Sequence, residues 1–349
     1  MSSSPDGAGD RIEDLDRLDD LLSEPTEEVI ETLGRLDGDI VLLGAGGKMG
    51  PSLSRMARRA SEAAGVRRRV IAVSRFSASG LREDLERHGI ETIACDLLEP
   101  AEVARLPDAP NVVYMAGRKF GTQGAEPLTW AMNVIAPAIA ARRYAGSRMV
   151  AFSSGNVYGL VPVSRHGSRE DDPTRPSGEY AMSVLGRERV LEHSSRALGI
   201  PMAVIRLNYA VEMRYGVLVD LAQRVLAGEP IDLSMGHANV IWQGDANAAT
   251  LRAFDHPATP PRIINVAGPE VLSVRQVCTE LGRLLGAPVR FTGAEAPDAL
   301  LSDGSLGRRL LGEPRVGADR LVRWTADWMR RGGIVHGLPT HFEVRDGSF

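Results

Sequence analysis

A short apolar run that breaks into regularly spaced glycines is the clearest pattern in the chain. Residues 40–43 are continuously apolar, which is typical of a strand buried on both faces of a parallel sheet. The glycines Gly44, Gly47 and Gly50 follow, with Lys48 and Met49 between the last two. In such a turn the first glycine permits a sharp bend, the second lets a pyrophosphate approach, and the third lets a helix pack on the strand. The pattern predicts a nucleotide-binding turn, with Lys48 adding positive charge.

Further apolar runs alternate with stretches of helical spacing along the first half of the chain. The predicted strands cover residues 69–74, 91–95, 111–115 and 148–152, and a helix is expected over residues 127–144. This alternation implies right-handed crossovers and therefore an α/β fold with a doubly wound parallel sheet of the Rossmann type. In such a sheet, ligands bind at the carboxyl ends of the strands.

Several residues at these strand ends are candidates for cofactor contacts. Arg75 stands where an acidic residue would hold the ribose 2′-hydroxyl of NAD, so it favours the 2′-phosphate of NADP; the alternative is a solvated arginine. Asp96 and Leu97 are placed to contact adenine, and the small residues Ala116 and Gly117 would let a cofactor approach. The expected cofactor is NADP or NAD.

A hydroxyl and a phenol occupy neighbouring positions in this scheme. Ser154 closes the fifth strand, and Tyr180 lies one loop later at the start of a helix, while Asn133 lies on the preceding helix. Groups on a strand end and on the following helix can meet across a bound cofactor.

The rest of the chain suggests four segments. We expect an acidic helical extension over residues 1–36, whose first ten residues form a loose tail, and a dinucleotide-binding domain over residues 37–212. Residues 213–332 would mainly form a smaller substrate-binding lobe, and residues 333–349 a loop-rich tail. The extension would cover a sheet edge or form a dimer contact, and Trp324 and Trp328 are expected in the core.

Composition excludes several classes of protein. A net charge of −4 gives no basic surface for nucleic acid, and no apolar run approaches the ~20 residues that a membrane span needs. The acidic N-terminus lacks an apolar signal core, and Cys95 and Cys278 have no CxxC partners, so we expect a cytoplasmic protein without disulfides or zinc. Lys48 and Lys119 are the only lysines, so chemistry that needs an amine has few candidates.

The order of these motifs resembles the extended short-chain dehydrogenase/reductases, the NAD-dependent epimerase/dehydratase family, over roughly residues 39–331. The similar segments are the glycine turn, Asp96-Leu97, Asn133, Ser154 with Val157-Tyr158-Gly159, Tyr180-Ala181-Met182-Ser183, Arg206-Leu207-Asn208, residues 240–249, Asn265-Val266-Ala267-Gly268 and Leu310-Leu311-Gly312. The resemblance implies that Tyr180 is the acid/base, that Ser154 binds the reacting oxygen, and that Asn133 supports the proton path. It also implies a cofactor contact at Asn208 and a small carbohydrate substrate.

The chain departs from the family pattern at the catalytic cation. The family lysine lies four residues after the tyrosine, where Val184 stands here, and without a nearby cation little of a phenol of pKa ~10 ionises at neutral pH. Lys119 is the candidate substitute, with Arg118 as a competitor; the alternative is a solvated loop cation.

Two further departures concern the substrate. Gly155 and Asn156 replace the acidic pair of the dehydratase branch, which disfavours dehydration. Ala238 stands in place of the arginine that grips the diphosphate of a nucleotide sugar, which leaves Arg214 and His237 as possible contacts for a simpler anionic or polyhydroxy substrate.

These observations support two hypotheses. The first is an NAD(P)-dependent oxidoreductase or epimerase that acts on a carbohydrate hydroxyl or ketone as a homodimer. The second is a catalytically degenerate cofactor-binding protein that serves as a sensor or assembly partner, with its N-terminal helices as the contact surface.

Overall fold

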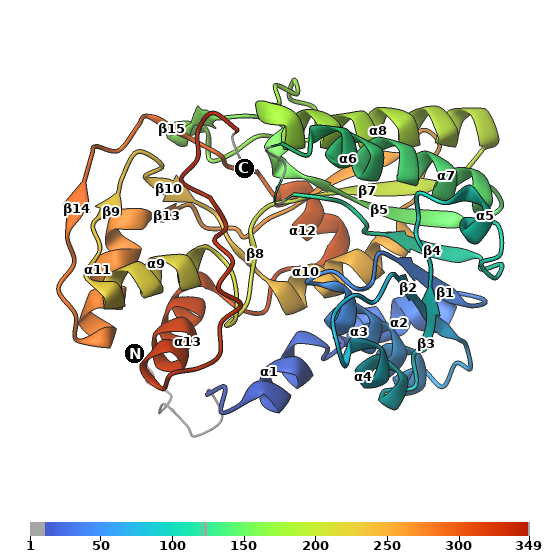
Figure 1. Cartoon of the computed structure of the whole chain (residues 1–349), viewed down its shortest axis with the longest axis horizontal. Helices are drawn as coiled ribbons and strands as arrows, with labels where there is room; N and C mark the ends of the chain where they lie inside the picture. The colour runs from blue at the N-terminus through green and yellow to red at the C-terminus, as the bar shows by residue number, and fades with distance from the viewer. Residues whose placement is uncertain (1–10, 120, 122–123, 348–349) are drawn as a thin grey trace.

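A parallel sheet of seven strands forms the centre of the protein in the computed structural model, which describes residues 11–119, 121 and 124–347 (Figure 1). The loose tail expected over residues 1–10 lies outside the described residues. The strand order is β12-β7-β5-β4-β1-β2-β3, which confirms the doubly wound sheet. The strands are β1 (Ile40–Leu43), β2 (Val70–Ser74), β3 (Glu91–Ala94), β4 (Asn111–Tyr114), β5 (Arg148–Ser154), β7 (Met202–Leu207) and β12 (Arg262–Val266).

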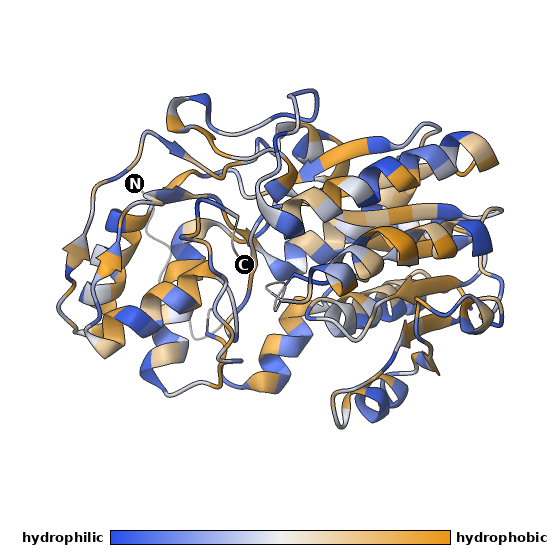
Figure 2. Ribbon diagram, turned by 45° about the horizontal axis from the view of Figure 1, so that its top comes forward, coloured by the Kyte–Doolittle hydropathy of each residue, from blue (hydrophilic) through white to orange (hydrophobic). Residues whose placement is uncertain are grey.

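Helices cover both faces of this sheet, because successive strand residues point to opposite sides. Ile40 and Leu42 belong to one apolar cluster, and Val41 and Leu43 belong to another. The first cluster includes α2 (Glu27–Arg35), α3 (Gly50–Ala63), α10 (Gln243–Arg252) and α12 (Ser305–Leu311), and the second includes α5 (Pro100–Val103), α7 (Ala136–Arg143) and α8 (Gly178–Leu198). The buried strands are largely hydrophobic in Figure 2, whereas polar residues gather on the outer helix faces.

A smaller lobe lies beside the sheet and is built mainly from the second half of the chain (Figure 1). Its core contains Trp242 and Trp324, whose rings meet edge to face at 5.5 Å, and Trp328 is buried as well, so the prediction of a core tryptophan pair is confirmed. The lobe consists of α9 (Val217–Ala227), α11 (Val274–Leu285), α13 (Ala318–Arg330) and short strand pairs: β8 (Ala210–Val211) with β11 (Ile241–Trp242), β9 (Ile231–Asp232) with β14 (Phe291–Thr292), β10 (His237–Ala238) with β13 (Leu272–Ser273), and β6 (Val161–Pro162) with β15 (Asp298–Ala299). Two short helices, α4 (Leu81–Arg87) and α6 (Glu126–Trp130), belong to the sheet domain.

The N-terminal helices are packed onto the rest of the chain. Leu18 and Leu22 of α1 (Leu15–Leu22) are fully buried in the lobe core, and Val29 and Leu33 of α2 are fully buried against the sheet face. Their apolar sides are therefore already covered within one chain. Among the described residues, no helix is both long and apolar enough to cross a lipid bilayer.

The C-terminal segment returns from α13 towards the sheet domain without forming a helix or strand over residues 333–347 (Figure 1, dark red). The Thr340 amide donates a hydrogen bond of 2.8 Å to Asp220 of α9, and the Ser177 hydroxyl donates one of 2.8 Å to the carbonyl of Asp346. The segment thus links the lobe to the start of α8 and brings Thr340 next to the site described below.

Candidate functional site

A cavity of about 340 Å³ lies at the carboxyl ends of β1, β4, β5 and β7. The strand order reverses between β1 and β4, which is where open α/β sheets bind ligands. Both the glycine turn and the loops of the lobe contribute to its wall. The lining residues are Gly47, Lys48, Met49, Met115, Gly117, Lys119, Phe152, Ser153, Ser154, Asn156, Tyr180, Leu207, Tyr209, Ala210, Val211, Tyr215, Gly216, Val217 and Thr340.

The three glycines of the turn have different surroundings. Gly44 has φ of +94°, and a Cβ there would lie 2.5 Å from the backbone of Ala116. A Cβ at Gly50 would lie 2.1 Å from the carbonyl oxygen of Ala45, so α3 packs directly on the turn. At Gly47, by contrast, the nearest atom to such a Cβ is 3.5 Å away, so its surface is open. An open glycine between two crowded ones is the arrangement that lets a phosphate approach the backbone.

Two backbone donors at the start of α3 are available to a ligand. The N–H groups of Lys48 and Met49 make no hydrogen bond within the described part of the chain, and both residues line the cavity. Such orphan donors at a helix N-terminus favour an anion. The residues present therefore fit the pyrophosphate of a dinucleotide.

The residues expected near the adenosine end lie outside this cavity. Asp96 accepts a hydrogen bond of 3.0 Å from the amide of Leu98, Leu97 is buried, and Arg75 is exposed after β2. Gly46 packs on Ser74, since a Cβ there would lie 2.2 Å from the serine oxygen. Contact of Arg75 or Asp96 with a cofactor thus stays a prediction.

The phenol of Tyr180 and the hydroxyl of Ser154 both line the cavity, and Ser154 lowers the pKa of the phenol as a hydrogen-bonding group. Ser154 Oγ also donates to Asn156 Oδ1 at 3.0 Å and accepts from the Asn156 amide at 3.2 Å. The strand β5 and the helix α8 therefore bring together the two groups that the sequence paired.

The surroundings of Tyr180 leave its phenol protonated at neutral pH. Burial raises the pKa of Tyr180, while the positive charge of Arg187 and the hydrogen bond from Ser154 act in the opposite direction. Val184, in the place of the family lysine, is buried with Val157 in a small apolar cluster. No cation therefore occupies that position.

Arg187 is the buried cation that the sequence analysis missed. Its guanidinium donates to the Phe152 carbonyl at 2.9 Å and to Asn133 Oδ1 at 2.7 Å, and a Cβ at Gly117 would lie 2.4 Å from it. The signal was present, because residue 187 lies seven positions after Tyr180, two turns along the same helix face. The family pattern directed attention to position 184 only.

Asn133 is held by hydrogen bonds from several sides. Its side chain accepts from the Arg118 amide at 2.9 Å and donates to the Arg118 carbonyl at 3.1 Å and to Ser183 at 2.8 Å. It lies in a π-helical turn over Ala131–Ile135 that interrupts the helix expected over residues 127–144. Pro137 has no N–H for the Asn133 carbonyl, which instead accepts from Arg187 at 3.4 Å. The residue is buried and does not line the cavity.

Lys119 reaches the cavity from the loop after β4. Its ammonium lies 6.0 Å from the centroid of the Tyr180 ring and donates to the Thr340 carbonyl at 3.3 Å. Desolvation lowers the pKa of Lys119 to about 8, against the opposing charge of Asp220. The competing cation Arg118 donates to the Gly121 carbonyl at 2.8 Å and does not line the cavity.

Other candidates lie away from the cavity. Asn208 is buried and donates to Asn239 Oδ1 at 2.6 Å, and His237 belongs to β10. Arg214 pairs with Asp19 at 2.9 Å and with Glu212 at 3.2 Å. None of the three lines the cavity, so the substrate contacts considered for Arg214 and His237 find no support in this geometry.

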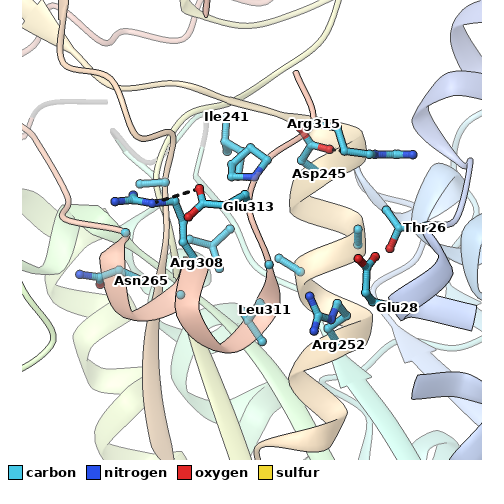
Figure 3. Close-up of a pocket in the computed structure, with 18 residues that line it drawn as sticks. Thr26, Glu28, Ile241, Asp245, Arg252, Asn265, Arg308, Leu311, Glu313 and Arg315 are labelled. Atoms are coloured by element: carbon cyan, nitrogen blue, oxygen red, sulfur yellow. Dashed lines mark hydrogen bonds and ion pairs between the residues drawn. The ribbon is translucent and has the colours of Figure 1, made fainter. Parts of the chain in front are cut away.

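A second, smaller cavity of about 150 Å³ lies between α2, α10 and α12 (Figure 3). Three arginines line it, and two of them form ion pairs: Arg308 pairs with Glu313 at 3.4 Å, and Arg315 pairs with Asp245 at 3.5 Å. No residue predicted for catalysis or cofactor binding lines it. Among the described residues, no cluster of histidine, cysteine and carboxylate side chains could hold a metal ion.

Comparison with known proteins gives a consistent result. A family model described as "NAD dependent epimerase/dehydratase family" matches residues 40–267, whereas a search of curated proteins found no match. Similar solved structures include the UDP-glucose 4-epimerase of Thermotoga maritima, with 18% identity, a TM-score of 0.69 and coverage of 84% of this chain and 99% of that one. The Thermus thermophilus UDP-glucose 4-epimerase in complex with NAD has 22% identity and a TM-score of 0.68, covering 85% and 100%. The dTDP-glucose 4,6-dehydratase DesIV of Streptomyces venezuelae has 19% identity and a TM-score of 0.71, covering 84% and 97%.

Proposed function

The chain belongs to the NAD-dependent epimerase/dehydratase family, and from this membership we propose that it is an NAD(P)-dependent oxidoreductase or epimerase acting on a carbohydrate hydroxyl or ketone. The observation that carries the proposal is that one cavity is lined by the Tyr180 phenol, the Ser154 hydroxyl and the open glycine Gly47. A phosphate site and a proton-transfer site in one cavity are what a nicotinamide-dependent reaction at a carbinol carbon requires.

The glycine turn supports the binding of NAD or NADP. The free N–H groups of Lys48 and Met49 would hold the pyrophosphate, and Gly117 would let the nicotinamide end approach the sheet. The cofactor, when bound, supplies the acceptor or donor of a hydride. The side chain of Arg75 is exposed after β2, where it would bind the 2′-phosphate, so the proposal keeps NADP as the preferred cofactor.

Tyr180 would move the proton that accompanies the hydride. Because its pKa is raised, the phenol is ready to donate a proton to a carbonyl oxygen without prior ionisation. In the oxidising direction the phenol must first lose its proton, so the rate should rise with pH. Ser154 would hold the same substrate oxygen, and its hydrogen bond to Asn156 would keep its hydroxyl in place.

Two cations would take over part of the task of the missing lysine. Arg187 stabilises the phenolate electrostatically and also fixes Asn133, so it acts as a positioning residue. Lys119 lies beside the ring of Tyr180 and lines the cavity, where it can contact substrate. Arginine stays charged at any physiological pH, so this electrostatic support does not titrate away.

The residues around Ser154 favour epimerisation or simple oxidation and reduction over dehydration. Elimination of water needs an acid and a base beside the reacting carbon. Asn156 offers only a neutral amide there, and its side chain is already bonded to Ser154.

The apolar surroundings of Val184 favour one alternative, a cofactor-binding protein without efficient catalysis. That alternative uses the N-terminal helix pair as a contact surface, but the apolar residues of these helices are already buried inside the chain, which counts against it. The charge of Arg187 near the phenol further favours the enzyme.

Replacing Tyr180 tests the proposal. The purified full-length protein would be titrated with NAD and NADP and then assayed for nicotinamide reduction with free sugars, sugar acids and nucleotide sugars. Tyr180→Phe should lower turnover by about 10²- to 10⁴-fold, because general acid catalysis contributes that much, and should still bind the cofactor. Tyr144→Phe, which removes a buried hydroxyl bonded to the Pro107 carbonyl away from the cavity, is the matched control. Full activity in Tyr180→Phe, or no binding of either dinucleotide, would overturn the assignment.

A further inference from the structure

Both lysines of the chain line the same cavity. They are the only lysines among 41 lysine and arginine residues, and they come from separate elements, Lys48 from the glycine turn and Lys119 from the loop after β4. Elsewhere the chain uses arginine for its positive charges. Both lysine side chains of the chain are thus placed at this cavity.

The amine of Lys48 reaches away from the glycine turn towards the lobe. Its Nζ atom donates to the carbonyl of Ala210 at 2.9 Å and lies 4.0 Å from the centroid of the Tyr215 ring. Within the described ranges, no carboxylate lies within 4.0 Å of this amine. A carbonyl and a ring face stabilise an ammonium only in part, so the charge keeps capacity for an anion.

The neighbouring arginine behaves differently. Arg214 also lies at the lobe side, but its guanidinium is neutralised by Asp19 and Glu212. Among the described residues that line the cavity there is no arginine, and the two cations are Lys48 and Lys119. The positive charge of Lys119 also lowers the pKa of Lys48.

On the basis of the proposed function, we propose that the substrate is a sugar that carries a carboxylate, which Lys48 binds with support from Lys119 while Tyr180 and Ser154 hold the reacting oxygen. A carboxylate matches the number and kind of charges present. A nucleotide diphosphate is usually bound through the planar fork of arginine, and both the lining and position 238 lack one.

The pKa values of the two lysine amines support a carboxylate as the ligand. Desolvation lowers the pKa of Lys48 to about 7, and that of Lys119 to about 8. An anion beside an amine favours the charged form and raises its pKa, so binding near pH 8 should take up protons, and affinity should fall as pH rises further. The charged groups that act on the Lys48 amine are Glu212 and Asp220, which favour its charge, and Lys119 and Arg214, which oppose it; His336 is also close enough to respond.

The test compares two sugars that differ only at one carbon, D-galacturonate and D-galactose, on the intact protein with its cofactor. We expect Lys48→Met to raise KM for galacturonate by about 10- to 100-fold, because a hydrogen bond to a charged group is lost, and to raise KM for galactose by a much smaller factor. NAD affinity is measured alongside, since Lys48 also belongs to the glycine turn. Lys48→Arg should recover part of the loss. Arg189→Met, which removes an exposed charge from the same helix as Tyr180, is the control for net charge.

Calorimetry in two buffers of different ionisation enthalpy adds a readout that needs no turnover. Galacturonate should take up protons on binding near pH 8, and galactose should not. Equal affinity for the two sugars, or a Lys48→Met variant that loses only NAD affinity, would overturn the inference and assign Lys48 to the cofactor. Tighter binding of a sugar phosphate or UDP-glucose than of the acid would also overturn it. In each case a Tyr180-dependent turnover of another sugar would leave the proposed function intact.

Discussion

Two of the cavities of the protein differ in how their positive charges are paired. In the small cavity between α10 and α12, Arg308 and Arg315 each pair with a carboxylate (Figure 3). In the large cavity, the amine of Lys48 has a carbonyl and a ring face as neighbours. The charges of Arg308 and Arg315 are satisfied by the fold itself, whereas the amine of Lys48 has capacity left for a ligand.

The difference also appears in the protonation of the two residue types. A guanidinium stays charged whatever its surroundings, so a paired arginine is a permanent structural contact. An amine responds to desolvation, and in the large cavity the pKa values of both lysines fall close to neutrality. We therefore expect the small cavity to serve stability and the large one to be the site of the proposed chemistry.

The largest expected difference between the cavities concerns turnover. Lys119→Ala should lower kcat by about 100-fold, because it removes the cavity cation nearest to the Tyr180 ring, and should leave cofactor affinity nearly intact. Arg118→Ala removes a neighbouring charge from the same loop, outside the cavity, and serves as control. Steady-state kinetics with a neutral sugar measures the effect, and an unchanged kcat would remove Lys119 from the mechanism.

A change in the small cavity should act on stability instead. Asp245→Ala removes the acceptor of the Val316 amide at 3.0 Å and the partner of Arg315. The free energy of unfolding in urea should fall by about 1–2 kcal/mol, because a buried donor loses its partner. The exposed carboxylate Asp171 provides the control variant Asp171→Ala, which should be neutral. A loss of kcat in Asp245→Ala with stability intact would contradict the division between the cavities.

The sequence predicted those parts of the molecule that depend on local pattern. The strand and helix alternation gave the sheet, and the hydroxyl of Ser154 meets the phenol of Tyr180 because strand ends and the following helices converge in any such sheet. Ser273 caps α11 by accepting from the amide of Gln276, a contact between close neighbours in the chain. These features require only neighbours in the chain or the regular geometry of the fold.

Contacts between distant segments were not predictable in this way. Arg187 contacts Asn133 at the π-helical turn, where Pro137 has no N–H for the Asn133 carbonyl. The local spacing of residues does not predict that turn. Arg214 forms an ion pair with Asp19, a residue of the N-terminal helix nearly 200 positions earlier. Thr340 reaches the cavity only because the C-terminal segment folds back onto α9. Charge pairing across such distances depends on the assembled structure.

The smallest expected effect is the pH dependence of stability that Lys48 contributes. Its pKa in the folded protein, about 7, lies below the ordinary value of 10.5, so between these values the unfolded chain binds more protons. The wild type should therefore become more stable relative to Lys48→Met as pH rises from 7 to 9. Because Lys48 is partly exposed, the slope should stay well below the ~1.4 kcal/mol per pH unit of a full proton. Urea unfolding at a series of pH values measures it, and a difference that widens in the opposite direction would show that the amine is charged and satisfied by the fold, as Arg308 and Arg315 are.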